Sequence, residues 1–336
     1  MPVFLGGPYG VIGRQYFWFI WWTQLGILSR MFKGLVTILR MIRFSHTVFA
    51  LPFAFLGAFL AGAGGAGGFC GWGKLGLILW CMVWARSAAM TFNRIVDVEI
   101  DSRNPRTSER ALVTGELSRK KAWMFWFGCV VLFSWGAYLF WEPLGYPLVQ
   151  REGWLGYGNY WPTVGAGPVL VFICMYSYTK RFTWLSHFWL GGSLMLAPVA
   201  AWAAVSPPEG PAVAWTPVVL GAAVLLWTAG FDIIYACQDI EVDRQEGLYS
   251  LPAALGRPGA LWVSRLCHSL TVTGLLGVGI LADLRGGIYL GAVGLTAALL
   301  VAEHILVVKG RVKLAFDLNG VIGIVLAGAG IVEIIF

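Results

Sequence analysis

Residues 75–101 of the chain read LGLILWCMVWARSAAMTFNRIVDVEID. An apolar segment long enough to cross a bilayer, which takes about 20 residues as a helix, ends there in the acids Asp97, Glu99 and Asp101. A second apolar run ends the same way, in FDIIYACQDIEVD at residues 231–243. Acids near a bilayer are costly and tend to face a cavity or a partner, so two matching clusters indicate a site built around cations.

The composition excludes an ordinary soluble domain. Of the 336 residues, 58% are hydrophobic and only 12% are charged, which is typical of a membrane protein with several spans. We therefore predict an all-α integral membrane protein whose nine transmembrane helices form one bundle around a central cavity. The nine apolar runs are residues 44–62, 75–93, 121–141, 164–179, 185–205, 213–232, 261–282, 287–307 and 317–335.

The basic residues orient the chain in the membrane. The net charge of +7 does not indicate a nucleic-acid-binding protein, because the basic residues are unevenly distributed. Most Lys and Arg fall in alternate loops, and few fall in the loops between them. An excess of Lys and Arg marks cytoplasmic loops. The N-terminus and both acidic clusters are thus predicted to be cytoplasmic.

Two regions are predicted along the chain. Residues 1–30 contain the aromatic run Phe17-Trp18-Phe19-Ile20-Trp21-Trp22, which is too short to span and lacks the features of a signal peptide. We expect an interfacial extension there. Residues 31–336 form the membrane domain, with a first acidic motif at 93–112 and a second at 232–252. Four spans separate the motifs, as in internally repeated bundles that share one cavity.

Helical spacing brings the acids of each motif onto one face. At 3.6 residues per turn, Asn93, Asp97 and Asp101 fall within about 80° of arc, and so do Asp232, Tyr235, Asp239 and Asp243. Crowded carboxylates repel unless a divalent ion holds them ionised. Oxygen ligands favour Mg²⁺, which often bridges carboxylates to substrate phosphates. A diphosphate is the expected substrate group, although structural ion pairs are the alternative interpretation.

Cations accompany both motifs on the predicted inner side, where Arg and Lys bind phosphate oxygens. They are Arg94, Arg103, Arg106, Arg110, Lys180, Arg181 and Arg244. A role in membrane topology alone remains open for them. The four histidines, in contrast, are far apart in sequence and show no metal-binding spacing, so we expect isolated polar groups at His46, His187, His268 and His304.

The two motifs resemble those of the UbiA superfamily of membrane prenyltransferases. Asn93-Arg94-x-x-Asp97-x-x-x-Asp101, followed by Asn104-Pro105-Arg106, is similar to the first motif. Asp232-x-x-Tyr235-x-x-Gln238-Asp239-x-x-x-Asp243 is similar to the second. Together with residues 42–54, they look most like bacterial 4-hydroxybenzoate polyprenyltransferases and their menaquinone-pathway relatives. The resemblance covers about residues 36–336.

The resemblance implies Mg²⁺-dependent transfer of a polyprenyl group from its diphosphate to an aromatic acceptor. It implies 4-hydroxybenzoate as the preferred acceptor, in quinone biosynthesis at the bacterial inner membrane. By the same resemblance, one Mg²⁺ is held by Asn93, Asp97 and Asp101, and a second by Asp232, Asp239 and Asp243. The diphosphate is expected to contact Arg94, Arg110, Lys180, Arg181 and Tyr176 or Tyr178. The acceptor is assigned to Arg43 and His46. A carboxylate or Tyr235 takes the ring proton.

Two alternatives remain at this point. A naphthoate of the menaquinone pathway is the rival acceptor, and the prenyl chain length cannot be read from the sequence. A membrane transporter is the rival from another class, since ionisable residues in a repeated bundle also form transport pathways. Its acids should lie near mid-membrane, whereas the acids here lie at the ends of spans.

Overall fold

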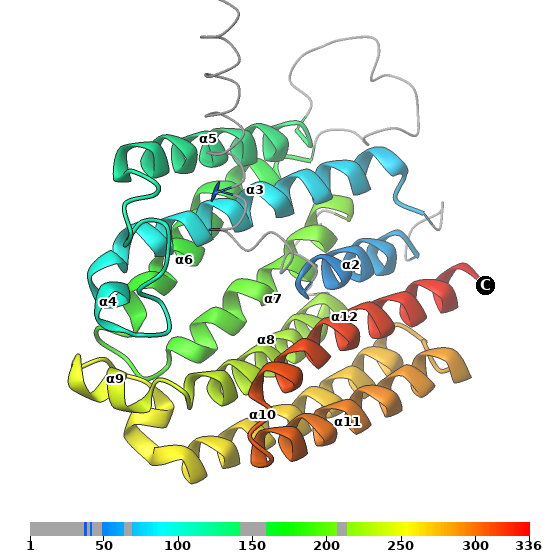
Figure 1. Ribbon diagram of the computed structural model, residues 1–336. Helices are drawn as coiled ribbons and strands as arrows, with labels where there is room; N and C mark the ends of the chain where they lie inside the picture. Colours follow the sequence, from blue (N-terminus) through cyan, green and yellow to red (C-terminus); the bar gives the residue numbers. More distant parts are fainter. Residues whose placement is uncertain (1–36, 39–40, 42–48, 64–68, 142–158, 207–213) are drawn as a thin grey trace, which may run out of the picture.

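The protein is a bundle of helices. The computed structural model describes residues 37–38, 41, 49–63, 69–141, 159–206 and 214–336, and the regular elements in those ranges are all helical, as predicted (Figure 1). In chain order they are α2 (Leu51–Ala63), α3 (Trp72–Val96), α4 (Val98–Arg103), α5 (Arg119–Tyr138), α6 (Trp161–Thr179), α7 (Ser186–Val205), α8 (Trp215–Ala236), α9 (Ile240–Gln245), α10 (Leu251–Leu281), α11 (Gly287–Val308) and α12 (Val312–Ile335).

Six of the helices are long and apolar enough to cross a membrane, namely α3, α7, α8, α10, α11 and α12. The chain is therefore a multi-pass membrane protein. Helix α2 has 13 residues, and residues 44–48 of the first predicted span lie outside the described part of the chain. Helices α5 and α6 have 20 and 19 residues. The count of nine spans stays a prediction.

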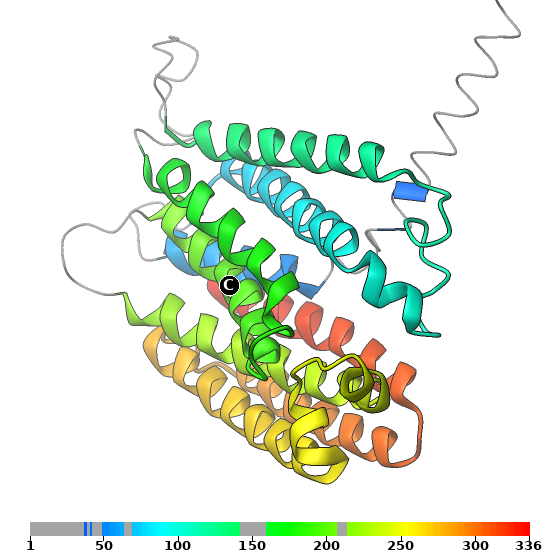
Figure 2. The same ribbon diagram turned by 90° about the vertical axis from the view of Figure 1, so that its left-hand side faces the viewer.

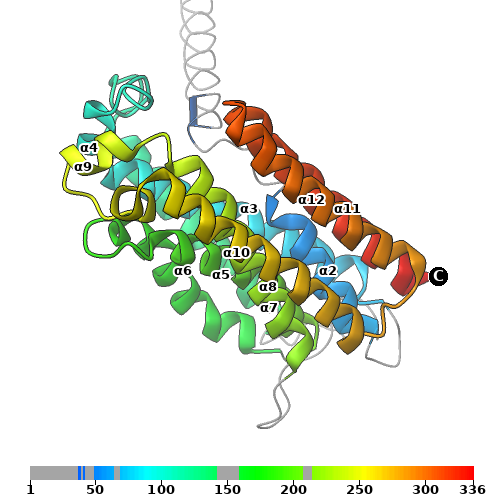
Figure 3. The same ribbon diagram turned by 90° about the horizontal axis from the view of Figure 1, so that it is seen from below.

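Both acidic motifs lie at one end of the bundle. Helix α3 leads into the short α4, and α8 leads into the short α9. Figures 1 and 3 show α4 and α9 next to each other at the end opposite the C-terminus. An ion pair of 3.1 Å between Arg103 Nη1 and Glu246 Oε2 connects the two segments. Seen from that end, α3 and α5 form one side of the bundle, and α10 and α11 form the other (Figure 2).

Each acidic motif interrupts its helix, which corrects the expectation of one unbroken helical face. Helix α3 stops at Val96, and Asp97 (φ −95°, ψ 7°) joins it to α4. Helix α8 stops at Ala236, and Asp239 (φ −108°, ψ 9°) precedes α9. The amide of Asp101 still donates to the carbonyl of Asp97 at 2.7 Å. Because this helical hydrogen bond persists, the carboxylates of the first motif keep their common direction.

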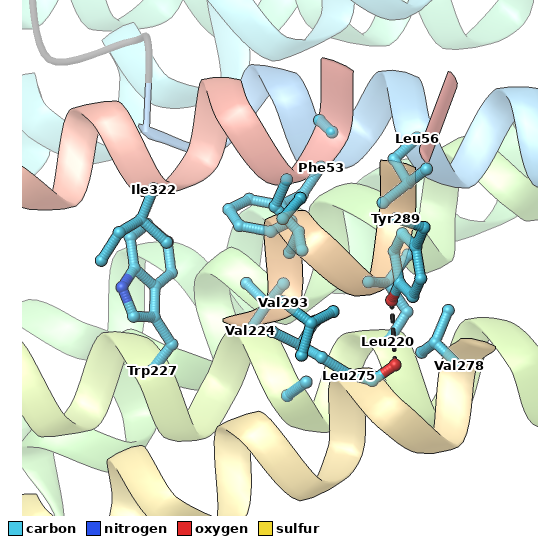
Figure 4. Packing of buried hydrophobic residues seen from close by; sticks show 14 of the residues in the cluster. Phe53, Leu56, Leu220, Val224, Trp227, Leu275, Val278, Tyr289, Val293 and Ile322 are labelled. Atoms are coloured by element: carbon cyan, nitrogen blue, oxygen red, sulfur yellow. Dashed lines mark hydrogen bonds between the residues drawn. The ribbon is translucent and has the colours of Figure 1, made fainter. Parts of the chain in front are cut away.

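The largest core cluster joins α2, α8, α10, α11 and α12. Trp227 and Tyr289 are its largest fully buried side chains. Figure 4 shows the Tyr289 hydroxyl donating to the Leu275 carbonyl, at 2.9 Å. Within a bilayer, where lipid is as apolar as the core, close packing and such hydrogen bonds hold helices together.

Glycines allow two of the closest helix contacts. A Cβ added to Gly191 of α7 would lie 2.3 Å from the Leu225 carbonyl oxygen of α8. A Cβ added to Gly57 of α2 would lie 2.5 Å from the Pro198 carbonyl oxygen of α7. Small residues at helix crossings are the usual means of close approach in membranes. Helix α7 is thereby fixed between α2 and α8, the helix that carries the second acidic motif.

Helix α10 begins ten residues before the predicted span of 261–282. Ser250 caps it, because its hydroxyl accepts from the amide of Ala253 at 3.3 Å. Gly256 (φ 66°, ψ 171°) then bends the helix just before Pro258. A positive φ is readily adopted only by glycine. The bend separates a short start, residues 251–255, which follows the second motif, from the longer apolar part that the sequence pattern identified.

Candidate active site

A polar cavity of about 300 Å³ lies between the two acidic motifs. Its lining draws on α3, α4, α6, α8 and α9 and on the loop that follows α4. It includes thirteen of the residues singled out from the sequence: Asn93, Arg94, Asp97, Asp101, Arg106, Arg110, Tyr176, Lys180, Arg181, Asp232, Tyr235, Asp239 and Asp243. Residues 93–110 and 232–243 thus meet in space, as expected from the paired motifs.

Asp97 is the best connected acid of the first motif. Its Oδ2 accepts from Asn93 Nδ2 at 2.6 Å, and its Oδ1 accepts from Arg181 Nη2 at 3.0 Å. Arg181 also donates to the carbonyls of Ser177 and Val96, so its guanidinium is fixed on the helix end. Burial raises the pKa of Asp97 to about 6, with a smaller contribution from the charge of Asp101 and against the opposing charge of Arg181.

Asp101 faces the loop that follows α4. Arg110 Nη1 forms a salt bridge with its carboxylate. The hydroxyl of Thr107 donates to the Asp101 carbonyl at 3.0 Å. The loop turns back because the Asn104 side chain accepts from the Arg106 amide at 2.9 Å, as asparagine does in turns. This fold-back brings both arginines of the loop over the cavity.

Asp239 of the second motif is held by residues that follow the first. Its carboxylate accepts two hydrogen bonds from Arg106 and one, at 3.3 Å, from Asn104 Nδ2. Arg106 Nη1 also lies 3.4 Å from the Tyr235 hydroxyl, and its guanidinium carbon is 5.2 Å from the centre of that ring. The hydrogen bonds and charge of Asp239 raise the pKa of Arg106 although burial acts in the opposite direction.

The remaining acids, Asp232 and Asp243, face basic residues of α7 and of the turn that follows α6. His187 Nδ1 and Asp232 Oδ2 are 2.7 Å apart. Asp243 is nearly fully buried, and its Oδ2 accepts no hydrogen bond from any described residue. The nearest cation, Lys180 Nζ, is 3.9 Å from that oxygen, which is too long for a hydrogen bond. A hydrogen-bond donor or a cation that enters the cavity would satisfy this oxygen.

The donor set suits a hard cation, although the present arrangement holds the acids apart. Among the described residues, no three acidic, His or Cys side chains are grouped closely enough to bind one metal ion. Each carboxylate of the cavity instead faces a basic residue. All the acidic ligands offer oxygen, and one buried oxygen lacks a hydrogen bond. Oxygen ligands of this kind fit Mg²⁺.

An apolar cavity of about 390 Å³ adjoins the polar one. It extends between α3, α5, α6 and α7 and is lined mainly by Ala, Met, Phe and Val side chains. Six residues line both cavities, so the two spaces meet: Arg86, Met90, Asn93, Tyr176, Leu190 and Leu194. The arrangement suits a ligand that has an anionic head and an apolar tail.

Sequence reasoning missed several contributors. Arg106 was expected only as one of several cations for phosphate, and Asn104 had no expected role, yet both contact Asp239. His187 contacts Asp232 rather than being isolated, and the rings of His268 and His304 also meet, at 3.1 Å between nitrogens. The turn-forming Asn104-Pro105 was the one available signal. The histidine contacts join segments too distant for any local pattern.

Three groups of residues predicted from the sequence are not among the described residues that line the polar cavity. Tyr178 is 37% exposed and lies against Arg181 and Phe92, whereas Tyr176 lines both cavities. Arg43 and His46, assigned to the acceptor, lie outside the described residues. The extension of residues 1–30 does as well.

Known proteins resemble the chain in sequence. Residues 50–318 match the UbiA prenyltransferase family. A 4-hydroxybenzoate octaprenyltransferase of Alcanivorax borkumensis is 32% identical over 215 residues, which are 64% of this chain and 66% of the relative, just under two thirds of its length. A relative of the same name from Acidovorax ebreus is 30% identical over 251 residues, covering 74% of this chain and 77% of the relative.

Solved structures share the fold. The apo structure of a UbiA homologue from Aeropyrum pernix K1 has a TM-score of 0.73 at 32% identity and covers 87% of this chain and 98% of that one. A UbiA homologue from Archaeoglobus fulgidus bound to GPP and Mg²⁺ has a TM-score of 0.61 at 19% identity, over 89% of this chain and 100% of that one. With a matched family and two meeting acidic motifs, the chain belongs to the UbiA prenyltransferase family.

Proposed function

We propose that the protein transfers a polyprenyl group from polyprenyl diphosphate to an aromatic acceptor, 4-hydroxybenzoate, in quinone biosynthesis. The observation that carries this proposal is the meeting of an acid-lined cavity with an apolar one at six common residues. A diphosphate head fits the first and a prenyl chain fits the second. The names of the relatives support 4-hydroxybenzoate as the acceptor.

Mg²⁺ is the proposed cofactor, with two ions in all. Asn93, Asp97 and Asp101 would hold one, and Asp232, Asp239 and Asp243 the other. The buried, unsatisfied Oδ2 of Asp243 supports a cation there, as does the Mg²⁺ bound with GPP in the Archaeoglobus fulgidus homologue. When bound, the metal neutralises charge on the departing diphosphate.

The basic residues of the cavity would turn from carboxylates to phosphate oxygens. Arg110, Lys180 and Arg181 now face Asp101, Asp243 and Asp97. A metal-bound carboxylate needs these cations less, and a diphosphate offers them stronger acceptors. In that position they stabilise the charge that develops on the leaving group. Arg94 and Tyr176, which also line the cavity, complete the proposed diphosphate site.

Tyr235 and the acids beside it would accept the ring proton once the new carbon–carbon bond has formed. The Tyr235 hydroxyl lies 3.4 Å from Arg106 Nη1, and Arg106 is bound to Asp239. A proton released in this cluster finds acceptors without entering the bulk. The apolar walls keep water from the allylic cation. Arg43 and His46 remain the proposed acceptor contacts.

The protein is proposed to lie in the bacterial inner membrane, with the site on its cytoplasmic side. The basic loops that follow both acidic motifs support this orientation, because Lys and Arg are enriched on the cytoplasmic side.

The donor and acceptor can be identified together. Membranes containing the protein are incubated with Mg²⁺, a series of polyprenyl diphosphates, and either 4-hydroxybenzoate or a hydroxynaphthoate. The expected product has the mass of a prenylated 4-hydroxybenzoate and is missing when Mg²⁺ is chelated. A prenylated naphthoate as the main product would instead place the enzyme in menaquinone synthesis. The absence of any prenylated aromatic product would contradict the proposal.

A further inference from the structure

A buried polar chain joins α8, α11 and α12. The indole Nε1 of Trp227 donates to Asn319 Oδ1 at 2.8 Å, and Asn319 Nδ2 donates to Glu303 Oε1 at 3.1 Å. All three side chains are at most 1% exposed. Nothing in the mechanism above uses them.

A packing role alone does not account for an acid at this place. Ionisable side chains within a membrane bundle are costly and mark functional positions. Glu303 Oε2 is buried and has no hydrogen-bond partner among the described residues, so the polar group is not fully compensated. A leucine would fill the site without that cost. Glu303 therefore provides something that an apolar side chain does not.

Glu303 contributes to the orientation of the Asn319 side-chain amide. The two ends of an asparagine amide have nearly the same shape, and hydrogen bonds alone decide which end points where. An indole N–H only donates, so Trp227 requires the oxygen of Asn319. Glu303 Oε1 accepts from the nitrogen, which keeps the oxygen directed at Trp227. Without Glu303, the Asn319 nitrogen keeps only its longer contacts with the backbone carbonyls of Ala315 and Phe316, at 3.3 and 3.5 Å.

Trp227 in turn supports the aromatic wall of the polar cavity. Its ring lies 5.1 Å from that of Phe231 at an interplanar angle of 71°, and 6.5 Å from that of Phe49. Phe231 and Phe49 line the polar cavity, and Phe231 directly precedes Asp232. Edge-to-face ring pairs have a preferred geometry, so Trp227 sets the position of the Phe231 ring together with the rings of Phe49 and Phe316, which also contact Phe231.

We propose that Glu303 is a positioning residue of the reaction, which acts through Asn319 and Trp227 on the Phe231 wall and thereby keeps the allylic cation from water. This inference rests on the proposed prenyl transfer. Ionisation breaks the allylic C–O bond, and the diphosphate oxygen keeps the electron pair. The cation then either joins the acceptor ring carbon, which releases a ring proton, or takes the oxygen of water, which releases a proton and yields prenol.

The test compares the products of three variants. Glu303→Leu removes the acceptor of the chain, Glu303→Gln keeps an oxygen for Asn319, and Thr296→Val is the control. Thr296 is fully buried two turns earlier on the same face of α11, and its hydroxyl is also without a partner among the described residues. In each membrane preparation, prenol and prenylated acceptor are quantified from one radiolabelled donor, with kcat and KM for the acceptor.

In Glu303→Leu the ratio of prenol to prenylated product should rise roughly fivefold, the effect of one lost hydrogen bond. Glu303→Gln and Thr296→Val should keep the ratio of the parent protein. A merely structural defect would lower both products together and leave their ratio unchanged. An unchanged ratio in Glu303→Leu overturns the proposal, and so does an equal rise in Thr296→Val.

A second measurement does not depend on activity. With ¹⁵N-labelled tryptophan, the indole signal missing from Trp227→Phe identifies Trp227. The Trp227 signal should shift and exchange its proton faster in Glu303→Leu than in the parent, and should do neither in Glu303→Gln. If the protein makes no prenylated product, the proposed function fails while this measurement still tests the chain. An unaffected indole signal in Glu303→Leu also overturns the proposal.

Discussion

At the scale of single residues, basic side chains now contact the carboxylates that the proposed metal ions would need. Asp97, Asp101, Asp239 and Asp243 each face an arginine or lysine. In the proposed reaction, a cation that enters would displace a basic residue, which would then be free to bind an anion. Such an exchange would make metal and diphosphate binding depend on each other, because each provides the charge that the other lacks.

The pH dependence of Mg²⁺ binding follows from Asp97. Burial raises its pKa to about 6, so the carboxyl is protonated over a range in which an exposed Asp is ionised. A metal ligand must be ionised. We expect the Mg²⁺ concentration for half-maximal activity to be constant above that value and to rise as the pH falls through it. Mg²⁺ titrations of activity at pH 5.5 and 7.5 test this.

The matched control replaces Glu99, an exposed acid of the same motif, by Gln. Glu99→Gln should show the same rise in the Mg²⁺ requirement as the parent protein. A requirement that is equal at both pH values would show that Asp97 is not the group that titrates.

At the scale of helices, one of the closest contacts is that of α7 with α8, and the sequence does not reveal it. Gly191→Ala would place its methyl carbon 2.3 Å from the Leu225 carbonyl oxygen. Backbone cannot move aside cheaply, so we expect a loss of about 1–3 kcal/mol in stability and a lower unfolding temperature in detergent. Since α7 carries His187, activity should fall as well.

Gly128→Ala is the control for that substitution, because a Cβ at Gly128 of α5 meets nothing within 4 Å. It should leave the unfolding temperature unchanged or raise it slightly, since alanine favours helix. An equal effect of both substitutions would contradict the contact between α7 and α8.

The helices show where sequence reasoning reached its limit. The apolar runs identified α3 and α8, and the spacing of Asn93, Asp97 and Asp101 identified one face of the site. The break at Asp239 and the bend at Gly256 were not predicted, because tertiary contacts and a single positive φ decide them. The meeting of Arg106 with Asp239 depends on how two distant segments pack, for which one sequence contains no periodic signal.

At the scale of the whole molecule, the length of the apolar cavity should limit the donor. Ala201 lines the cavity and lies seven residues beyond Leu194 on α7, about 10 Å farther from the polar cavity along the helix. Ala201→Phe should shorten the space, so transfer from long polyprenyl diphosphates should fall while transfer from short ones is retained. A series of donors, compared by product yield, measures this preference.

Val131→Phe is the matched control, because Val131 of α5 is 48% exposed and lies on the outside of the bundle. It should leave the preferred donor length unchanged. If Ala201→Phe lowers transfer equally for all donors, the prenyl chain of the donor does not occupy this cavity.

The central claim is that the acids of both motifs act together in one Mg²⁺-dependent site. The most direct measurement compares prenyl transfer by Asp97→Asn and Asp239→Asn with that by Glu99→Gln and Glu241→Gln, which alter exposed acids of the same two motifs. We predict a loss of about 100-fold or more for each of the first pair, and near-normal activity for the second pair. Full activity in either Asp97→Asn or Asp239→Asn, or an equal loss in all four variants, would contradict the claim.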